Sequence, residues 1–252
     1  MDLKEEEILG DQVNSHWYYR AKAAALLQNM RGQTPREVLD VGAGSGFFSR
    51  MLLKETGAER ATCVDIGYAR DRDEICHGKP IAFRRSLGPC QADLVLAMDV
   101  IEHVADDRSL IRSYSDLVAP GTRFIFSVPA FNFLWSAHDV FLEHHRRYTL
   151  RSLSAAMRES GLVVDWGHYY YGSVFPLAAG IRLLERLRGA RTAEPKSQLQ
   201  QHGGLVNAVL SAALAAERPV MRFNQLFGLT VFAGGHKPSA VRYLSGAPAG
   251  GR

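Results

Sequence analysis

The sequence has few cysteines, no long apolar run and no strong excess of charge, and each absence excludes a class of protein. Its three cysteines, Cys63, Cys76 and Cys90, form no C-x-x-C pair, and an odd number is a poor basis for a disulfide framework. No run reaches the ~18 apolar residues that a membrane-spanning helix needs. The first residues, MDLKEEEILGDQ, are acidic and lack the basic and apolar regions of a signal peptide. We therefore expect a cytoplasmic protein with reduced thiols.

The formal net charge of the 252 residues is only +4, which is too weak to indicate nucleic-acid binding. This mild basicity fits an anionic substrate or a peripheral contact with the inner face of the membrane. Charged residues at 22% and apolar residues at 46% are ordinary values for a folded chain with a sizeable core. The length suits one large domain, or a domain with an insert.

Strand and helix signals alternate along most of the chain. An N-terminal helix is predicted from about residue 5 to residue 30, and later helices at residues 46–56, 106–118 and 150–161. Strands are predicted at residues 37–41, 61–65, 82–85, 92–98, 122–128, 162–171 and 229–237. Several of these strands are near-continuous apolar runs, such as ADLVLAM and RFIFSV, which is typical of buried parallel strands. The sequence thus predicts an α/β fold with a seven-stranded, mostly parallel, doubly wound sheet.

The pattern changes between the last two predicted strands. Two apolar helices, SVFPLAAGIRLLERLRGAR and LVNAVLSAALAAERPVM, flank a polar stretch rich in helix breakers. We therefore divide the chain into an N-terminal helical cap (1–35), a core (36–172 and 229–240), a helical insert or lid (173–228) and a flexible tail (241–252). The arginine-rich insert either packs on the sheet, covers an apolar substrate or lies on an anionic membrane.

A glycine-rich loop follows the first strand, in EVLDVGAGSGFFSR. Asp40 ends the strand, and Gly42, Gly44 and Gly46 follow at every second position. Glycines let the backbone turn tightly and let a ligand lie against bare amides. A dinucleotide site requires a small residue three positions after the second glycine, and Phe47 is too bulky for that role. Asp40 would favour a positively charged ligand and would repel a pyrophosphate.

The second strand ends in Asp65, and an acid at this position can accept hydrogen bonds from both ribose hydroxyls. The ligand is therefore expected to have a ribose, to carry positive charge and to lack a pyrophosphate. S-adenosylmethionine meets all three conditions.

Four ordered motifs carry a family resemblance, and they cover roughly residues 37–128: DVGAGSG, VDI, ADLVLAMDVIEHV and LVAPGTRFIFSVPA. The chain resembles class I S-adenosylmethionine-dependent methyltransferases. The resemblance implies a Rossmann-like fold with S-adenosyl-L-methionine as co-substrate. It also implies a wider cofactor site, formed by Asp40, Gly42, Ala43, Gly44, Gly46, Asp65, Ile66, Met98 and Asp99.

The N-terminal stretch SHWYYRAK is similar to a segment that covers the cofactor in one bacterial branch of this family. By that resemblance Trp17 would stack on the cofactor and Arg20 would pair with its carboxylate. The alternative is an ordinary amphipathic helix in which Trp17 and Tyr18 belong to the core.

The segment WSAHDVFLEHHRRYTLRSL, after the fifth strand, has the highest density of polar side chains. Open α/β sheets place their sites at such strand ends. The segment resembles a signature of methyltransferases from surface-polysaccharide and natural-product pathways, which aligns His144 with the family histidine. We assign His144 and Asp139 as candidate catalytic residues, with His144 as the general base. The alternative is a structural ion-pair network of Asp139, Arg146 and Arg147.

A divalent metal is a further alternative, because MDVIEHV places Asp99, Glu102 and His103 close together and His144 or His145 could complete the ligands. Mg²⁺ prefers oxygen ligands, so we favour a site without metal. A nucleic-acid acceptor is not expected, since the sequence has no N-P-P-aromatic motif. The sequence predicts methyl transfer to a small-molecule or lipid-linked acceptor, most readily at oxygen, with C- or N-methylation or a non-catalytic cofactor-binding module as alternatives.

Overall fold

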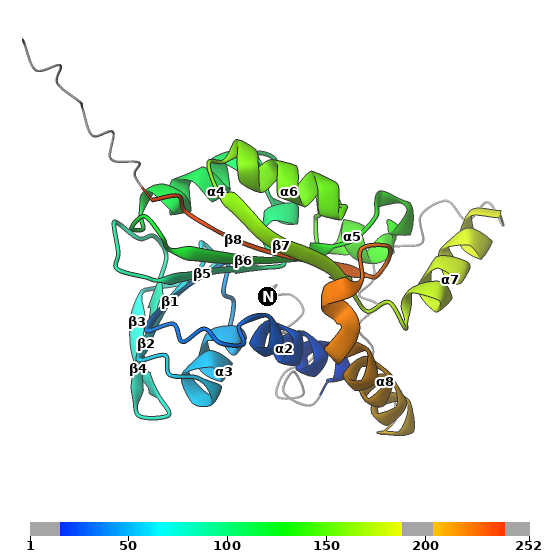
Figure 1. Ribbon diagram of the computed structural model, residues 1–252, viewed down its shortest axis with the longest axis horizontal. Coiled ribbons are helices and arrows are strands. Elements are labelled where there is room, and N and C mark those ends of the chain that lie inside the picture. The colour runs from blue at the N-terminus through cyan, green and yellow to red at the C-terminus, as the bar shows by residue number, and fades with distance from the viewer. Residues whose placement is uncertain (1–15, 188–203, 240–252) are drawn as a thin grey trace, which may run out of the picture.

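The computed structural model describes residues 16–187 and 204–239 of the chain (Figure 1). The predicted helix upstream of residue 16, the polar stretch before residue 204 and the tail at 241–252 therefore lie wholly or largely outside the described residues. The α-helices are α2 (Trp17–Asn29), α3 (Phe47–Glu55), α4 (Asp107–Asp116), α5 (Ala137–Phe141), α6 (Leu150–Glu159), α7 (Phe175–Leu187) and α8 (Gly204–Glu217). Short 3-10 helices are η2 (Ile101–His103), η3 (Asn132–Leu134) and η4 (Arg218–Phe223).

The strands are β1 (Glu37–Val41), β2 (Arg60–Val64), β3 (Arg72–Cys76), β4 (Lys79–Arg84), β5 (Leu94–Met98), β6 (Arg123–Pro129), β7 (Val163–Tyr170) and β8 (Thr230–His236). Within the described residues they form one sheet in the order β3-β4-β2-β1-β5-β6-β8-β7. The five central strands are parallel, whereas β3, β7 and β8 pair antiparallel with their neighbours. The predicted fold class is confirmed, including helices inserted before the last strand.

The sheet has eight strands in the described part of the chain, rather than the predicted seven. The additional strand is β3, which forms a hairpin with β4 through His77 and Gly78, both at positive φ. Two consecutive residues at positive φ make the turn type that best suits a two-residue hairpin. The strand itself, RDEIC, is polar and largely exposed at the sheet edge, so it lacks the apolar pattern that revealed the other strands.

Helices cover both faces of the sheet and divide the core in two. Helices α4 and α6 lie on one face, and α2, α3 and α8 lie on the other (Figure 1). The central strand β5 is buried along its whole length, which explains its continuous apolar sequence. No helix in residues 16–187 or 204–239 is long and apolar enough to cross a membrane.

The N-terminal helix and the insert pack against each other, although they are far apart in the sequence. Helix α2 lies beside α8, and the backbone N–H of Trp17 donates to the Asn207 side chain over 2.9 Å. The Tyr171 hydroxyl, just after β7, donates to the carbonyl of Tyr18 over 2.7 Å. These bonds hold the start of α2 beside the chain that leads into the insert.

Candidate active site

The glycine loop has the geometry that its sequence predicts. Gly42, Gly44 and Gly46 all have positive φ, between 55° and 75°. A Cβ atom at Gly42 would lie 2.7 Å from the Val100 side chain, and one at Gly46 would lie 3.0 Å from the sulfur of Cys63. The backbone conformation and the lack of space therefore both require glycine. A cavity of about 420 Å³ borders this loop at Gly44.

The two acids of the loop region differ in their surroundings. Asp40 is buried and accepts a hydrogen bond from the Ser49 hydroxyl over 2.9 Å. Burial raises the pKa of Asp40 to about 6. Asp65 is half-buried and accepts bonds from the backbone N–H groups of Gly44, over 3.1 Å, and of Gly67, over 2.8 Å. The Asp65 carboxylate is thus fixed beside the loop, as a ribose-binding acid would need to be.

Apolar residues of the predicted cofactor site lie on both sides of the strand ends. Ala43, within the loop, and Met98, at the end of β5, are both buried. Ile66, directly after Asp65, is 87% exposed. An apolar side chain this exposed, next to the acid predicted to bind ribose, suits contact with the adenine ring of the predicted cofactor.

The helix α2 brings a different basic residue to the site than the sequence indicated. Arg20 is exposed, whereas Lys22 is buried and pairs with Asp99 at the end of β5. Lys22 also donates to the Tyr18 hydroxyl over 2.6 Å. Burial acts to lower the pKa of the Lys22 ammonium, but Asp99 and Tyr18 together outweigh it and the pKa is raised. Lys22 was missed because a lone lysine in the sequence does not show whether it is buried.

Asp99 itself is held in an unusual backbone conformation. Its φ is +56°, a region that non-glycine residues seldom adopt. Its carboxylate accepts a hydrogen bond from the Ser127 hydroxyl over 3.1 Å, and its backbone N–H donates to the Ser127 carbonyl over 2.8 Å. These bonds and the Lys22 pair together fix the acid where β5 ends.

A second cavity, of about 360 Å³, lies beyond Asp99 and between α2, α5 and α7. We call it the acceptor cavity. Most of its wall is apolar and includes Leu134, Leu142, Leu177 and Ile181. Its polar side chains are Asp99, Glu102, His103, His138, His144, Arg147 and Arg182. Trp17 also lines the cavity, and its buried indole N–H has no hydrogen-bond partner among the described residues.

His144 is held by a carboxylate that is itself fixed. Asp139 is fully buried, and its side chain accepts from the Nδ1–H of His144 over 2.9 Å. Arg147 donates to both oxygens of Asp139, over 2.6 and 2.9 Å. The backbone N–H of Ser136 donates to the same carboxylate. Burial acts to raise the pKa of Asp139, but the bonds from His144 and Arg147 hold it below its usual range. Because the carboxylate only accepts, Nδ1 carries the hydrogen and Nε2 carries the lone pair.

The structure thus contains both arrangements that the sequence left open. The ion pair of Asp139 with Arg147 is present, and the same Asp139 orients His144. Arg146 lies in a different pair, with Asp107 over 3.3 Å. Asp139 therefore contacts His144 and Arg147 and does not itself line the acceptor cavity.

Glu102, His103 and His144 form a compact group on the cavity wall, with one ligand atom of each within 4.8 Å of the others. Glu102 is fully buried, and neither of its oxygens has a hydrogen-bond partner among the described residues. His103 bonds the Leu142 carbonyl through Nδ1 over 2.9 Å. This set, one carboxylate and two imidazoles fixed from behind, has the chemistry to hold a divalent transition metal. Asp99 is paired with Lys22 instead, and His145 is exposed outside the group.

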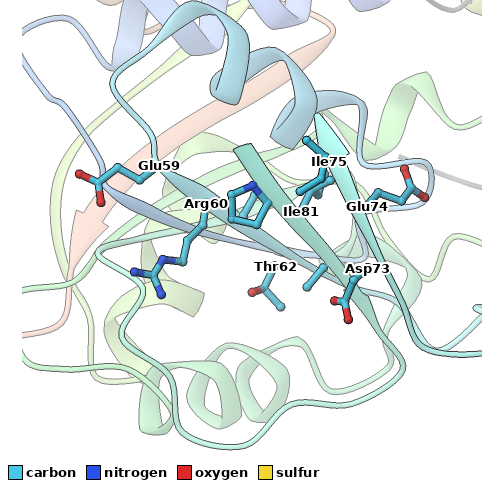
Figure 2. A pocket seen from close by; sticks show the side chains of 10 residues that line it. Glu59, Arg60, Thr62, Asp73, Glu74, Ile75 and Ile81 are labelled. Atoms are coloured by element: carbon cyan, nitrogen blue, oxygen red, sulfur yellow. The ribbon is translucent and has the colours of Figure 1, made fainter. Parts of the chain in front are cut away.

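A still larger cavity, of about 580 Å³, lies on the face of β2, β3 and β4 that no described helix covers. Figure 2 shows its side chains, among them Arg60, Thr62, Asp73 and Ile75. They lie toward the start of β2 and β4, whereas Asp65 follows the end of β2, and no histidine is among them. The chemistry of the side chains, rather than cavity size, identifies the acceptor cavity as the candidate active site.

Comparison with known proteins identifies the family of the chain. A family described as a methyltransferase domain matches residues 15–165, which include the glycine loop, both acids and His144. The chain is 30% identical over 113 residues to a ubiquinone biosynthesis O-methyltransferase of Yersinia pestis. The match covers 40% of this chain and 46% of the relative, so the chain spans less than half the length of the curated relatives it matches.

Solved structures show the same fold at low sequence identity. The N-methyltransferase NodS from Bradyrhizobium japonicum superposes with a TM-score of 0.53 and 12% identity, over 94% of this chain and 97% of that one. A methyltransferase from Haloferax volcanii, solved with the activator Trm112, gives 0.53 and 17% identity over 90% and 92% of the two chains. At these identities the likeness concerns the fold alone.

Proposed function

The chain belongs to the methyltransferase domain family, and on that premise we propose that it transfers a methyl group from S-adenosyl-L-methionine to a hydroxyl of a small or lipid-linked acceptor. The observation that carries the choice of oxygen is the His144–Asp139 pair on the wall of the acceptor cavity. A hydroxyl must lose its proton as it attacks, whereas an activated ring carbon has less need of a base.

The cofactor would lie along the glycine loop, with its ribose on Asp65 and its cationic end toward Asp99. The adjoining cavity would hold the acceptor, so that its oxygen faces the methyl group. Alignment of the two groups supplies much of the acceleration, because the sulfonium is already an activated electrophile. The acceptor oxygen forms a bond to the methyl carbon as the carbon–sulfur bond breaks, and S-adenosylhomocysteine leaves with the bonding pair.

The proton of the acceptor hydroxyl would pass to Nε2 of His144. The Asp139 carboxylate stabilises the imidazolium that forms, and Arg147 keeps that carboxylate ionised and in place. The apolar wall at Leu134, Leu142 and Ile181 would hold the carbon skeleton of the acceptor. Arg182, at the same wall, suits an acidic group on the acceptor.

A divalent metal is the competing assignment for the same side chains. Bound by Glu102, His103 and His144, it would lower the pKa of an acceptor hydroxyl and would occupy the histidine that otherwise acts as base. The two assignments differ in one measurable respect. A metal-dependent enzyme loses turnover in a chelator and recovers it with added Mn²⁺ or Mg²⁺. The turnover of an enzyme that uses a histidine base changes with neither addition.

The test is methyl transfer from radiolabelled S-adenosylmethionine to matched acceptors that differ only in a phenolic hydroxyl or an amine. We expect transfer to the hydroxyl, and a loss of about 100-fold or more in turnover for His144→Ala. His145→Ala is the matched control, because this neighbouring histidine is exposed and should be dispensable. Full activity of His144→Ala would remove the base, and transfer only to the amine would overturn O-methylation. Cofactor binding without transfer to any acceptor would favour a non-catalytic module.

A further inference from the structure

The insert exposes an unusual amount of apolar surface. Of the sixteen exposed large apolar side chains in the described residues, eleven lie on α7, α8, η4 or the loop after η4. Leu205 and Leu226 are the most exposed of these, at 80% and 76%. Helix α8 has no charged residue before Glu217, so its solvent side is apolar as well.

The elements that carry these side chains are linked in the fold. Helix α8 runs directly into η4, and the two elements contact each other. The loop after η4 meets α7 through the rings of Phe227 and Phe175, whose centroids lie 5.3 Å apart. We call this the insert face, and define it by α7, α8 and residues 218–227. Exposed apolar side chains gathered on linked elements in this way mark places where a partner or a membrane binds.

The charge of the insert indicates which partner fits. The three segments that form the insert face contain four arginines but only two glutamates, so the face carries a net positive charge. On the face itself, Arg222 is exposed and lies over the Phe223 ring, 4.6 Å from its centroid. A symmetric contact with a second copy would bring these like charges together. An anionic lipid surface instead attracts them while it buries the apolar side chains.

We propose that the insert face docks on an anionic lipid bilayer. The surface combines the two contributions that hold a peripheral protein on a membrane, apolar side chains that enter the interface and cationic ones that meet the headgroups.

The docked orientation also bears on the acceptor cavity, and this step rests on the proposed function. Helix α7 belongs to both surfaces, since Leu177 and Ile181 are exposed and also line the cavity. A bilayer against α7 would therefore meet the cavity wall directly. An acceptor with an apolar tail could reach His144 while its tail remained in the lipid.

The experiment is flotation of the full chain with vesicles of phosphatidylcholine, alone or mixed with phosphatidylglycerol. We expect binding to the mixed vesicles, weaker binding at high salt and little binding to phosphatidylcholine alone. Val209→Asp with Leu226→Asp should lower the partition coefficient at least about tenfold, because charge is excluded from the interface. Equal binding to neutral vesicles, or no binding to either, would overturn the proposal.

Ile75→Asp is the matched control, since Ile75 is 71% exposed but lies on β3, at the opposite edge of the sheet from β7. An equal loss of binding in this variant would also contradict the insert face. Light scattering tests whether a second copy of the chain binds the insert face instead. If the wild-type protein is a dimer and the double variant Val209→Asp with Leu226→Asp is a monomer, the face belongs to a second copy. Affinity for S-adenosylhomocysteine is measured on the same variants. Loss of vesicle binding with normal affinity is a failure of docking alone, whereas loss of affinity in the wild-type protein is a failure of the proposed function.

Discussion

The glycine loop and the acceptor cavity lie at the ends of the neighbouring strands β1 and β5, yet their polar groups are satisfied in different ways. In the loop region Asp40 and Asp65 both accept hydrogen bonds from the protein. On the cavity wall the Glu102 carboxyl and the Trp17 indole N–H are buried without a partner among the described residues. Buried polar groups without partners are costly, so they are retained where a ligand completes them. The acids of the loop are thus fixed by the protein itself, whereas the two cavity groups have no such protein partner among the described residues.

The largest effect is expected at the loop. Gly44→Arg should abolish binding of S-adenosylhomocysteine, because the side chain would occupy the path of the ligand and the residue has a φ of +55°. Calorimetric titration measures the affinity. Gly78→Arg is the control, since Gly78 also has positive φ but lies in the β3–β4 turn with open space around it. If both variants bind normally, the loop is not the cofactor site.

The next effect concerns Asp99, the acid directly after β5 on the wall of the acceptor cavity. Asp99→Asn would leave the Lys22 ammonium buried without its counter-charge, which lowers the free energy of unfolding by about 3 kcal/mol. Urea denaturation measures this change. The control is Glu59→Gln, which breaks an exposed ion pair with Arg36 and should leave the midpoint unchanged. Equal stability of Asp99→Asn and wild type would show that Lys22 does not depend on Asp99.

The charge of Asp40 should make cofactor binding depend on pH. Its pKa is raised to about 6 by burial, so the carboxyl becomes neutral as the pH falls through 6. A cationic ligand loses its counter-charge in that range, and affinity should be about tenfold lower at roughly one unit below the pKa. In Asp40→Asn the affinity should be lower than in wild type and independent of pH from 5 to 7. Calorimetric titration at several pH values measures the affinity and easily resolves a ~tenfold change. A flat profile in the wild-type protein would mean that Asp40 does not contribute its charge.

The smallest effect is expected for the unpartnered acid of the cavity. Glu102→Gln replaces a buried carboxyl with a neutral amide of similar shape. The free energy of unfolding should therefore be higher than that of the wild type or lie within about 1 kcal/mol of it. Urea denaturation in a chelator gives this value. Added Mn²⁺ should change neither protein. Stabilisation of the wild type by Mn²⁺, lost in Glu102→Gln, would instead favour the metal assignment.

What the sequence could predict follows from how local each feature is. The glycine loop, its two acids and the buried strands are encoded within short segments, and these predictions of the fold are confirmed. The Asp139–His144 pair is also local, since both residues belong to one short segment. Strand β3 was missed because an exposed edge strand needs no apolar pattern. Lys22 and Glu102 become notable only through burial, which depends on segments distant in the sequence.

The most direct test of the central claim is calorimetric titration of the wild-type protein with S-adenosylhomocysteine, with NAD in a parallel cell. The loop geometry and the two acids predict one site per chain with an affinity on the order of micromolar, and no heat from NAD. Absence of binding to S-adenosylhomocysteine, or binding to NAD instead, would contradict the account.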